Sequence, residues 1–373
     1  MKIAIDCRLY RESGIGRYIR NLVSNLEILD TKNEYFLLLK REDFEGCSFA
    51  DNFKKVKADI SWYTLEEQLK IPKILNKISP DLVHFPHFNV PILYKKKYLV
   101  TIHDLIHQHF SLKRASTKNA AAFYFKQLGY KKVFGNALKK SSKIITPSNF
   151  VKSQLIKEWR MKEEKILVTP EGVEESLVQI SRNTTEVGMA KTLKKFGILD
   201  PYFFYVGNAH PHKNIPFLIK AFLKFKEENP NFSLVLTGAE NYFWKQIKNE
   251  FEVEGIIYTG YVTDEELVSL YQKSEAFLMP SLEEGFGIPV LEAMALETPV
   301  ISAEIGSLLE IGREACLYFN PKKEADLIAK MITIIHDKKV KNTLIREGLE
   351  RALDFSWKKM AAQTLKAYRE QAL

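Results

Sequence analysis

The sequence lacks the features of a membrane-spanning, secreted or disulfide-stabilised protein. No apolar run among its 373 residues approaches the roughly 20 residues that a helix needs to cross a bilayer. Its three cysteines, Cys7, Cys47 and Cys316, have no metal-ligand spacing, so a disulfide framework or a zinc site is not expected. The strand-like segment Lys2–Asp6 stands at the start with no signal peptide before it, which favours a cytoplasmic location.

Charge is unevenly divided along the chain. Residues 1–170 hold 31 Lys and Arg against 17 Asp and Glu, a net +14, and the remainder holds 24 against 29, a net −5. Basic residues gather between Lys113 and Lys165, including Lys126, and at Lys95–Lys97. An anionic membrane surface at the inner face of the membrane is one partner that such a region fits, and nucleic acid is the rival. A solvated lysine-rich surface is the third interpretation.

Strand-like and helix-like segments alternate along the chain, which predicts an α/β protein with parallel sheets covered by helices. Its length fits two domains. The predicted strands of the first domain are Lys2–Asp6, Tyr35–Lys40, Leu82–Phe85, Tyr98–Ile102, Ile144–Thr146 and Ile166–Thr169. Those of the second are Phe203–Val206, Leu234–Thr237, Ile256–Tyr258, Ala276–Met279, Val300–Ser302 and Cys316–Phe319. Each half therefore has enough strands for its own doubly wound, Rossmann-like sheet, with the boundary near Pro170–Val173.

The segment Glu284–Glu292 is the most informative of the chain. It joins the strand that ends near Pro280 to a helix that carries Pro289 in its first turn. Unpaired N–H groups at a helix start attract phosphate, and glycines such as Gly287 allow a ligand to approach the backbone. Carboxylates at two depths could accept hydrogen bonds from sugar hydroxyls. The segment predicts a site for a phosphorylated sugar, although such turns are also common without one.

Two further motifs follow predicted strands. Gly14 and Gly16 lie between the first strand and a helix-like stretch, where N–H groups could meet phosphate or sugar; a simple tight turn is the alternative. The full G-x-G-x-x-G pattern is missing, so dinucleotide binding is a poor interpretation. His103 and Asp104 end another strand, and a histidine beside an aspartate also fits a hydrolase with an oriented imidazole, although no serine or cysteine stands in an activated nucleophile motif.

In this order and spacing, these segments resemble glycosyltransferase family 4, a large family of retaining, nucleotide-sugar-dependent enzymes. The resemblance covers nearly the whole chain and centres on an E-x7-E signature between Glu284 and Glu292. The other matching segments are Ser13–Tyr18, Thr101–Leu105, Thr146–Ser148, Tyr205–Gly207, His212–Asn214, Thr298–Ser302 and Phe355–Trp357.

The resemblance implies a GT-B architecture of two Rossmann-like domains that face each other across a cleft. In it, residues 1–172 would bind the acceptor and residues 173–355 the nucleotide-sugar donor. Residues 356–373 would form a helix that crosses back to the first domain. From the sequence alone this last helix is only amphipathic.

The resemblance also implies roles for individual residues. Lys213 would contact the donor diphosphate, Glu284 the hydroxyls of the donor sugar, and Glu292 the ribose. The expected catalytic residues are Glu284, His103 and Lys213. The remaining donor-binding residues are Gly14, Gly16, Asn208, His212, Val262, Gly285, Phe286, Gly287, Ile288 and Glu292, and the acceptor side holds His103, Asp104 and His107. Asn208 and His212 stand where many members have arginine, which leaves the second phosphate contact open.

The implied activity is hexosyl transfer with retention, without a metal or other cofactor, to a saccharide or lipid-linked acceptor in cell-surface polysaccharide synthesis. GDP-mannose is the leading donor, with a UDP-hexose or a dTDP-deoxysugar as alternatives. A sugar-nucleotide epimerase of the same architecture and a basic nucleic-acid-binding protein are the rival functions. Nucleic acid is not expected as a partner, because the second domain is acidic and no recognised motif is present.

Overall fold

The computed structural model of the chain describes residues 1–110, 120–199 and 201–371. They divide into two compact units, residues 1–171 with 356–373, and residues 172–355. The break after Glu171 lies one residue before the boundary expected from the sequence. No helix in these ranges is both long and apolar enough to cross a membrane.

The first unit is built on a seven-stranded parallel sheet with the order β3-β2-β1-β4-β5-β6-β7. Its strands are β1 (Lys2–Asp6), β2 (Glu34–Leu39), β3 (Phe53–Lys57), β4 (Leu82–Phe85), β5 (Tyr98–Thr101), β6 (Lys143–Thr146) and β7 (Ile166–Val168). The sequence pattern predicts all of them except β3. That strand lies at the sheet edge, pairs only with β2, and exposes its lysines, so its apolar alternation is weak.

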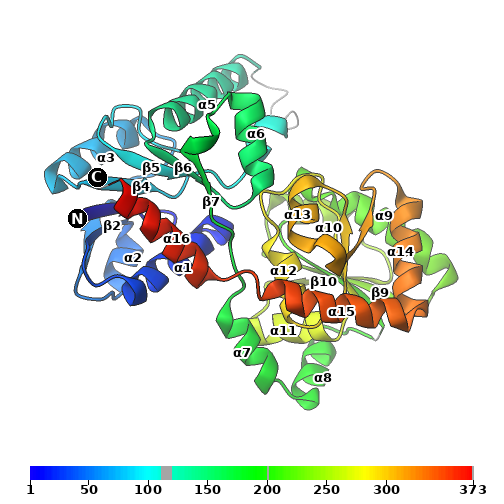
Figure 1. The fold of residues 1–373 in the computed structure, drawn as a ribbon. Coiled ribbons are helices and arrows are strands. Elements are labelled where there is room, and N and C mark those ends of the chain that lie inside the picture. The colour runs from blue at the N-terminus through cyan, green and yellow to red at the C-terminus, as the bar shows by residue number, and fades with distance from the viewer. Residues whose placement is uncertain (111–119, 200, 372–373) are drawn as a thin grey trace. The chain divides into compact units, whose positions relative to one another are not determined.

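Helices connect these strands (Figure 1). They are α1 (Ser13–Leu29), α2 (Arg41–Gly46), α3 (Leu65–Ile78), α4 (Ile106–His109), α5 (Ala120–Lys140), α6 (Asn149–Trp159) and the 3-10 turn η1 (Glu163–Lys165). The strand order reverses between β1 and β4, so right-handed crossovers place helices on both faces of the sheet. Such a reversal creates the crevice where doubly wound sheets bind ligands.

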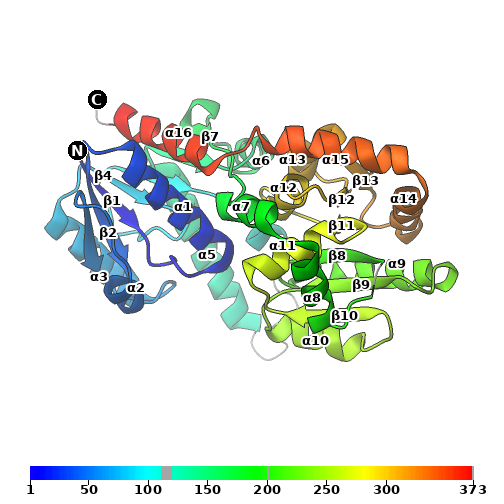
Figure 2. The ribbon, with the colours of Figure 1, turned by 90° about the horizontal axis from the view of Figure 1, so that it is seen from below.

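The last helix, α16 (Trp357–Glu370), belongs to the first unit although the chain reaches it only after completing the second. It packs along α1, from the opposite end of the chain (Figures 1 and 2). Its buried Tyr368 hydroxyl lies 2.6 Å from Nδ1 of His84 on β4, and Nε2 of His84 lies 2.8 Å from the Thr101 hydroxyl on β5. These bonds fix α16 to the centre of the sheet.

The second unit holds a six-stranded parallel sheet with the order β10-β9-β8-β11-β12-β13. Its strands are β8 (Tyr202–Val206), β9 (Ser233–Thr237), β10 (Ile256–Gly260), β11 (Ala276–Met279), β12 (Val300–Ala303) and β13 (Cys316–Phe319). Every one of them lies where the sequence predicts a strand. The predicted pair of doubly wound parallel sheets is therefore confirmed.

The helices of the second unit surround a core rich in phenylalanine, tyrosine and leucine. They are α7 (Glu175–Asn183), α8 (Glu186–Lys195), α9 (Ile215–Glu228), α10 (Tyr242–Glu250), α11 (Asp264–Gln272), α12 (Ile288–Ala295), α13 (Gly306–Gly312), α14 (Glu324–His336) and α15 (Lys338–Ala352), with the 3-10 turns η2 (Pro211–Lys213) and η3 (Arg313–Ala315). Helix α12 packs against α15, and α9 against α14. The strand order reverses between β8 and β11, so a second ligand-binding edge is expected there.

Candidate functional site

Lys213 and Glu284 meet at the reversal point of the second sheet. Lys213 closes η2 after β8, and Glu284 lies in the loop after the neighbouring strand β11. Lys213 Nζ donates to Glu284 Oε1 at 2.6 Å, with the two side chains 15% and 10% exposed. The structure thus brings together two of the three residues expected to be catalytic. A largely desolvated cation beside a carboxylate can contact both an anionic group and a hydroxyl.

The loop that carries Glu284 is braced at both ends. Ser307 donates its hydroxyl hydrogen to the Glu284 carbonyl at 2.7 Å. On the other side, Asn214 donates its amide to the carbonyls of Pro280 and Pro321, at 3.2 and 3.0 Å. Asn214 directly follows Lys213 in the chain. Its hydrogen bond to Pro280 therefore ties the backbone that carries Lys213 to the loop that carries Glu284.

Helix α12 begins at this loop, with Pro289 in its first turn as predicted. Gly287 caps it with φ of 124°, a conformation that side chains resist, and a Cβ atom there would lie 2.7 Å from Leu308 Cδ2. No side chain of the described residues caps this helix start by a hydrogen bond, and its first turn holds no acidic residue. Pro289 has no N–H, and the Val290 N–H donates to the Gly287 carbonyl at 3.0 Å, so an anion would be met by the partial positive charge of the helix start and by the N–H groups before Pro289.

Glu292 lies inside the second unit, one turn into α12. It is only 2% exposed, and Tyr271 of α11 donates its hydroxyl hydrogen to Glu292 Oε2 at 3.2 Å. The same hydroxyl lies 3.3 Å from the Pro289 carbonyl. Glu292 is therefore more deeply buried than Glu284, in agreement with the two depths that the sequence predicts.

Other predicted donor residues surround this pair, with side chains that the protein partly uses itself. The Asn208 amide oxygen accepts from the His210 N–H at 3.2 Å, and Phe286 is buried against Phe355. His212 stacks on the His210 ring at 5.9 Å. Gly285 lies in the loop after β11 and Ile288 at the start of α12, whereas Val262 follows the edge strand β10, which β9 and β8 separate from β11. Phe286 can therefore offer a ligand backbone groups more readily than its side chain, whereas the Asn208 carbonyl already accepts the Tyr205 hydroxyl at 2.8 Å.

Gly14 and Gly16 differ from the prediction in their local structure. Helix α1 begins at Ser13, so both glycines lie within its first turn and not in a turn before it. A Cβ atom at Gly16 would lie 2.5 Å from the Tyr10 carbonyl oxygen, whereas at Gly14 it would meet nothing within 4 Å. Close packing against the preceding loop explains Gly16, and only Gly14 leaves open space for a ligand.

His103 does not pair with Asp104, as the hydrolase interpretation requires. Its Nδ1 lies 3.1 Å from Glu171 Oε1, and its Nε2 lies 3.0 Å from the Pro86 carbonyl. Asp104 instead accepts from the N–H of Ile106, the first residue of α4, at 2.9 Å. The sequence missed Glu171 because 68 residues separate it from His103.

His107, predicted on the acceptor side, is exposed on α4. Its ring lies 6.0 Å from the Phe88 ring and 6.2 Å from the Tyr130 ring. The aromatic surface that it joins stands beside the loop after β4. The exposed His107 ring can therefore contact a ligand, whereas both ring nitrogens of His103 are hydrogen-bonded within the protein.

A buried polar cluster at the reversal point of the first sheet was also missed. Arg8 contacts Asp6 through two of its nitrogens, at 2.6 and 2.8 Å, and Glu67 at 2.6 Å. Glu67 also accepts from Asn89 at 2.7 Å. A cavity of about 20 Å³, room for one water, lies beside it and is lined by Asp6, Arg8, Leu9, Trp62, Phe85, Pro86, His87 and Asn89. In the sequence, this cluster was indicated only by the opposite charges of Asp6 and Arg8 at the end of the first predicted strand.

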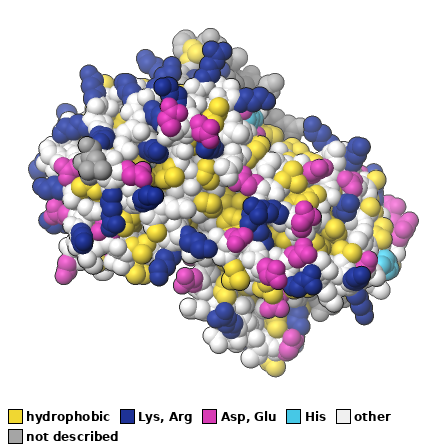
Figure 3. Space-filling view, in the orientation of Figure 1, with side chains coloured by type: hydrophobic (Ala, Val, Ile, Leu, Met, Phe, Trp, Pro, Cys, Tyr) yellow, Lys and Arg dark blue, Asp and Glu magenta, His cyan; other side chains and the backbone are white. Residues whose placement is uncertain are grey.

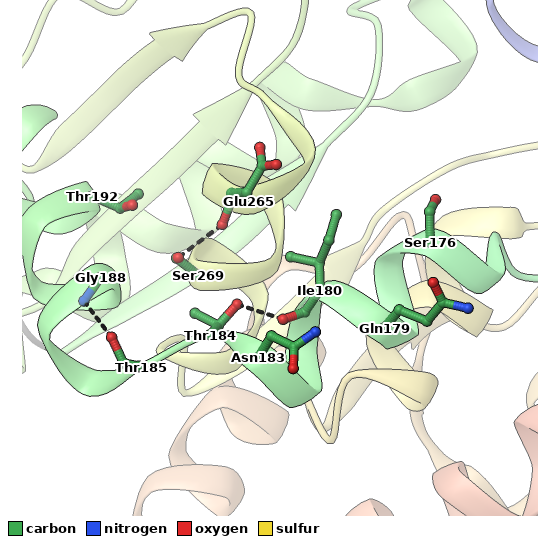
Figure 4. A pocket seen from close by; sticks show the side chains of 10 residues that line it. All are labelled: Ser176, Gln179, Ile180, Asn183, Thr184, Thr185, Gly188, Thr192, Glu265 and Ser269. Atoms are coloured by element: carbon green, nitrogen blue, oxygen red, sulfur yellow. Dashed lines mark hydrogen bonds between the residues drawn. The ribbon is translucent and has the colours of Figure 1, made fainter.

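A larger cavity of about 490 Å³ lies between α7, α8 and α11 of the second unit (Figure 4). Its lining, shown as sticks, is made of hydroxyl, amide and carboxylate side chains with Ile180, and includes no cation or aromatic ring. Several of its hydroxyls bond within their own helices, as Thr184 does to Ile180 and Ser269 to Glu265.

Over the described parts of the chain, no group of three or more His, Cys, Asp or Glu side chains could hold a metal ion.

Comparison with known proteins assigns both units. Residues 13–177 match the model of Glycosyltransferase Family 4, and residues 191–351 match that of Glycosyl transferases group 1. The chain is 27% identical to O-antigen chain mannosyltransferase B of Escherichia coli over 96% of this chain and 97% of the relative. It is 28% identical to O-antigen chain mannosyltransferase RfbU of Salmonella typhimurium over 70% of this chain and 67% of that one.

The fold is shared with solved structures of low sequence identity. One is HepE of Anabaena in complex with UDP-glucose, with a TM-score of 0.75, 15% identity, and coverage of 99% of this chain and 100% of that one. With one model matching in each unit and two doubly wound parallel sheets in the described structure, the chain belongs to glycosyltransferase family 4 and has the GT-B fold.

Proposed function

We propose that this glycosyltransferase moves a hexose, with retention, from a nucleotide diphosphate sugar to a saccharide or lipid-linked acceptor in cell-surface polysaccharide synthesis. The observation that carries the proposal is the contact of 2.6 Å between Lys213 and Glu284 beside the start of α12. Mannose from GDP-mannose is the leading donor, because O-antigen chain mannosyltransferases are among the relatives. The binding of UDP-glucose by HepE keeps a UDP-linked donor as the alternative.

The second unit is the proposed donor site. Lys213 and the N–H groups of Phe286 to Ile288 at the α12 start would hold the diphosphate, Glu284 the hydroxyls of the sugar, and Glu292 the ribose. When the bond between the sugar carbon and the diphosphate oxygen breaks, negative charge grows on the diphosphate, and Lys213 is placed to stabilise it. The acceptor oxygen then attacks from the same face, and its proton passes to the departing diphosphate.

We propose that Lys213 and the α12 start supply the positive charge that this reaction needs, so no metal is required. The first unit would bind the acceptor, where the polar cluster of Asp6, Arg8, Glu67 and Asn89 meets the loop after β4. Asp6 is the member whose carboxylate borders the small cavity, so it is the one best placed to accept a hydrogen bond from an acceptor hydroxyl.

An anionic membrane surface is the proposed docking partner. Leu65 and Leu69 of α3 are 85% and 54% exposed, and Leu93 is 52% exposed. The segment that holds Leu93 lies beside α3, because the Ile92 N–H donates to the Gln68 side chain of that helix. Exposed Lys95–Lys97 follow this segment, so apolar side chains and cations stand together. Lys113 lies outside the described residues, and the side chain of Lys126 is not described. On the face in Figure 3, basic side chains over the first unit are interspersed with acidic ones, so the proposal rests on this smaller patch.

Liposome flotation tests the docking. We expect binding to vesicles with anionic lipid that weakens as salt rises, and loss of it in the double variant Leu65→Asp and Leu69→Asp. Val187→Asp, at an exposed apolar position of α8, is the matched control and should bind as the wild type does. Equal binding to neutral and anionic vesicles would count against the docking proposal.

A transfer assay tests the main proposal. Purified protein is incubated with GDP-mannose, UDP-hexoses or dTDP-deoxysugars, with and without EDTA and with mannose-containing oligosaccharide or lipid-linked acceptors. We expect one donor to give an acceptor-dependent product whose anomeric configuration, followed by NMR, matches that of the donor. Product with inverted configuration, or loss of all activity with EDTA, would contradict the corresponding part of the proposal. Conversion of a donor without acceptor would indicate an epimerase instead.

A further inference from the structure

We propose that Glu171 is a positioning residue that holds His103 as an imidazolium, with both ring N–H groups donated to the protein. His103 then acts as a fixed cation and not as a proton donor or acceptor for the substrate. The charge state stands on the geometry of the first unit alone, whereas its consequence for transfer rests on the proposed function.

The geometry of the ring gives the first argument. Nε2 lies 3.0 Å from the Pro86 carbonyl oxygen, which can only accept a hydrogen bond, so Nε2 must carry a proton. Nδ1 lies 3.1 Å from Glu171 Oε1, and an ionised carboxylate is likewise an acceptor only. A neutral imidazole has one N–H and can satisfy one of these two partners. Both hydrogen bonds together therefore call for the charged ring.

The surroundings support the same charge state. Burial lowers the pKa of His103, but the hydrogen bond and the charge of Glu171 oppose it, with the Pro86 carbonyl and Asp104 adding to them, so the net pKa is raised above its ordinary value. The side chains of His103 and Glu171 are 15% and 7% exposed, so water screens their attraction little.

The other groups that face the ring compete little for its proton. Burial, and then the charge of His103, lowers the pKa of His84 and of His87 to about 3, so both stay neutral beside it. Arg8 contributes further to the lowering at His87. Tyr18 of α1 meets the His103 ring edge-on at 4.8 Å, and burial raises the pKa of its hydroxyl, so it remains uncharged.

The position of the pair gives it a structural task at the ligand edge of the sheet. Pro86 follows β4, His103 follows the neighbouring strand β5, and Glu171 follows β7 and is the last residue of the first unit before the chain leaves it. The ring thus joins three segments beyond the carboxyl ends of their strands. Because both ring nitrogens are hydrogen-bonded to the protein, the ring can present only its carbon atoms and its positive charge to a ligand. His103 therefore cannot take the proton of the acceptor hydroxyl, and that proton passes to the departing diphosphate.

Nitrogen-15 NMR of histidine-labelled full-length protein tests the charge state without any need for activity. At pH 8, where ordinary histidines are neutral, we expect both ring nitrogens of His103 to show imidazolium shifts. The His103→Gln variant assigns the signal. In Glu171→Gln the signal should move to the neutral form at the same pH, while Glu175→Gln, an exposed carboxylate close in sequence at the start of α7, should leave it unchanged. A neutral His103 at pH 8 in the wild type would overturn the proposal, as would an imidazolium indifferent to Glu171→Gln.

The pH profile of transfer tests the consequence. We expect kcat/KM of the wild type to show no loss from His103 between pH 6.5 and 8. In Glu171→Gln, kcat/KM should fall about tenfold over that interval, because His103 loses its charge there and no longer acts as a fixed cation. An equal loss at every pH would indicate a structural role only and contradict the positioning role. If no sugar is transferred by any variant, the proposed function fails, and the NMR result still decides the charge state.

Discussion

Lys213 Nζ and Glu284 Oε1 lie 2.6 Å apart, across the point where the strand order of the second sheet reverses. The cation proposed to hold the donor diphosphate is therefore already neutralised by the carboxylate proposed to hold the donor sugar. A diphosphate that approaches Lys213 must compete with Glu284, and the exchange would free that carboxylate for the hydroxyls of the sugar. The two roles are coupled through one ion pair.

The variant Glu284→Gln should separate these roles. We expect it to bind the free nucleoside diphosphate about fivefold more tightly, the equivalent of ~1 kcal/mol, because Lys213 loses its competitor. Transfer should fall about 100-fold, because the contact with the sugar is weakened. Isothermal titration with the diphosphate and a transfer assay measure the two effects. Weaker binding of the free diphosphate would contradict the competition.

Removing the cation should have the opposite effect on diphosphate binding. Lys213→Met should weaken it and lower kcat by about 10²–10³-fold, the usual effect of losing one group that stabilises charge in the transition state. Lys220→Met, an exposed lysine of α9, is the matched control and should behave as the wild type. If Lys213→Met retained wild-type kcat, another residue would have to hold the leaving group.

Gly287→Ala tests the backbone at the start of α12. With φ of 124° and Leu308 Cδ2 only 2.7 Å from the position of a Cβ atom, we expect a loss of about 1–3 kcal/mol in the free energy of unfolding. Gly188→Ala in α8 is the control, since its Cβ atom would meet only Thr185 Oγ1 at 3.5 Å. Chemical denaturation of the two variants measures the difference, and an equally stable Gly287→Ala would contradict the strain.

The buried histidine His84 should make the first unit sensitive to acid. Burial lowers the pKa of His84 from 6.5 to about 3. Between these two pH values the unfolded chain binds a proton at His84 and the folded chain does not. The stability that depends on neutral His84 is complete above pH 6.5 and declines by about 1.4 kcal/mol for each pH unit below it, until pH reaches about 3. His84→Gln cannot be protonated and should show a shallower decline between pH 6 and 4 in denaturant titrations.

The matched control for acid sensitivity is His336→Gln at the exposed end of α14. This variant measures what replacing an exposed histidine does to the pH dependence of unfolding. His103 adds a term of the opposite sign, because its raised pKa stabilises the fold fully below pH 6.5 and that contribution disappears as the pH rises through its folded value. An identical slope in His84→Gln and the wild type would contradict the neutral buried state of His84.

Features that depend on neighbouring residues in the chain could be predicted from the sequence. The loop from Glu284 to α12 is an example, because its glycines, proline and carboxylates lie within nine residues and each has a local conformational meaning. Apolar runs located the buried strands for the same reason. Edge strand β3 was not predicted, because three of its five residues, Phe53–Lys57, are lysines and the apolar alternation typical of a strand is weak.

Contacts between distant segments could not be predicted from local patterns. Glu171 reaches His103 across 68 residues, and Glu67 reaches Arg8 across 59, so only the folded sheet brings them together. The adjacent Asp104 looked like the partner of His103, yet its side chain satisfies a backbone N–H at the start of α4. The first N–H groups of a helix have no partner within the helix, and the Asp104 carboxylate accepts from one of them.

The most direct test of the proposed donor site is isothermal titration of the wild type and Lys213→Met with GDP, UDP and dTDP, each with and without EDTA. We predict that one nucleotide binds the wild type tightly, that the affinity is indifferent to EDTA, and that Lys213→Met loses it. Binding that vanishes with EDTA, or that is equal in Lys213→Met and the wild type, would contradict a donor site built on Lys213 beside Glu284.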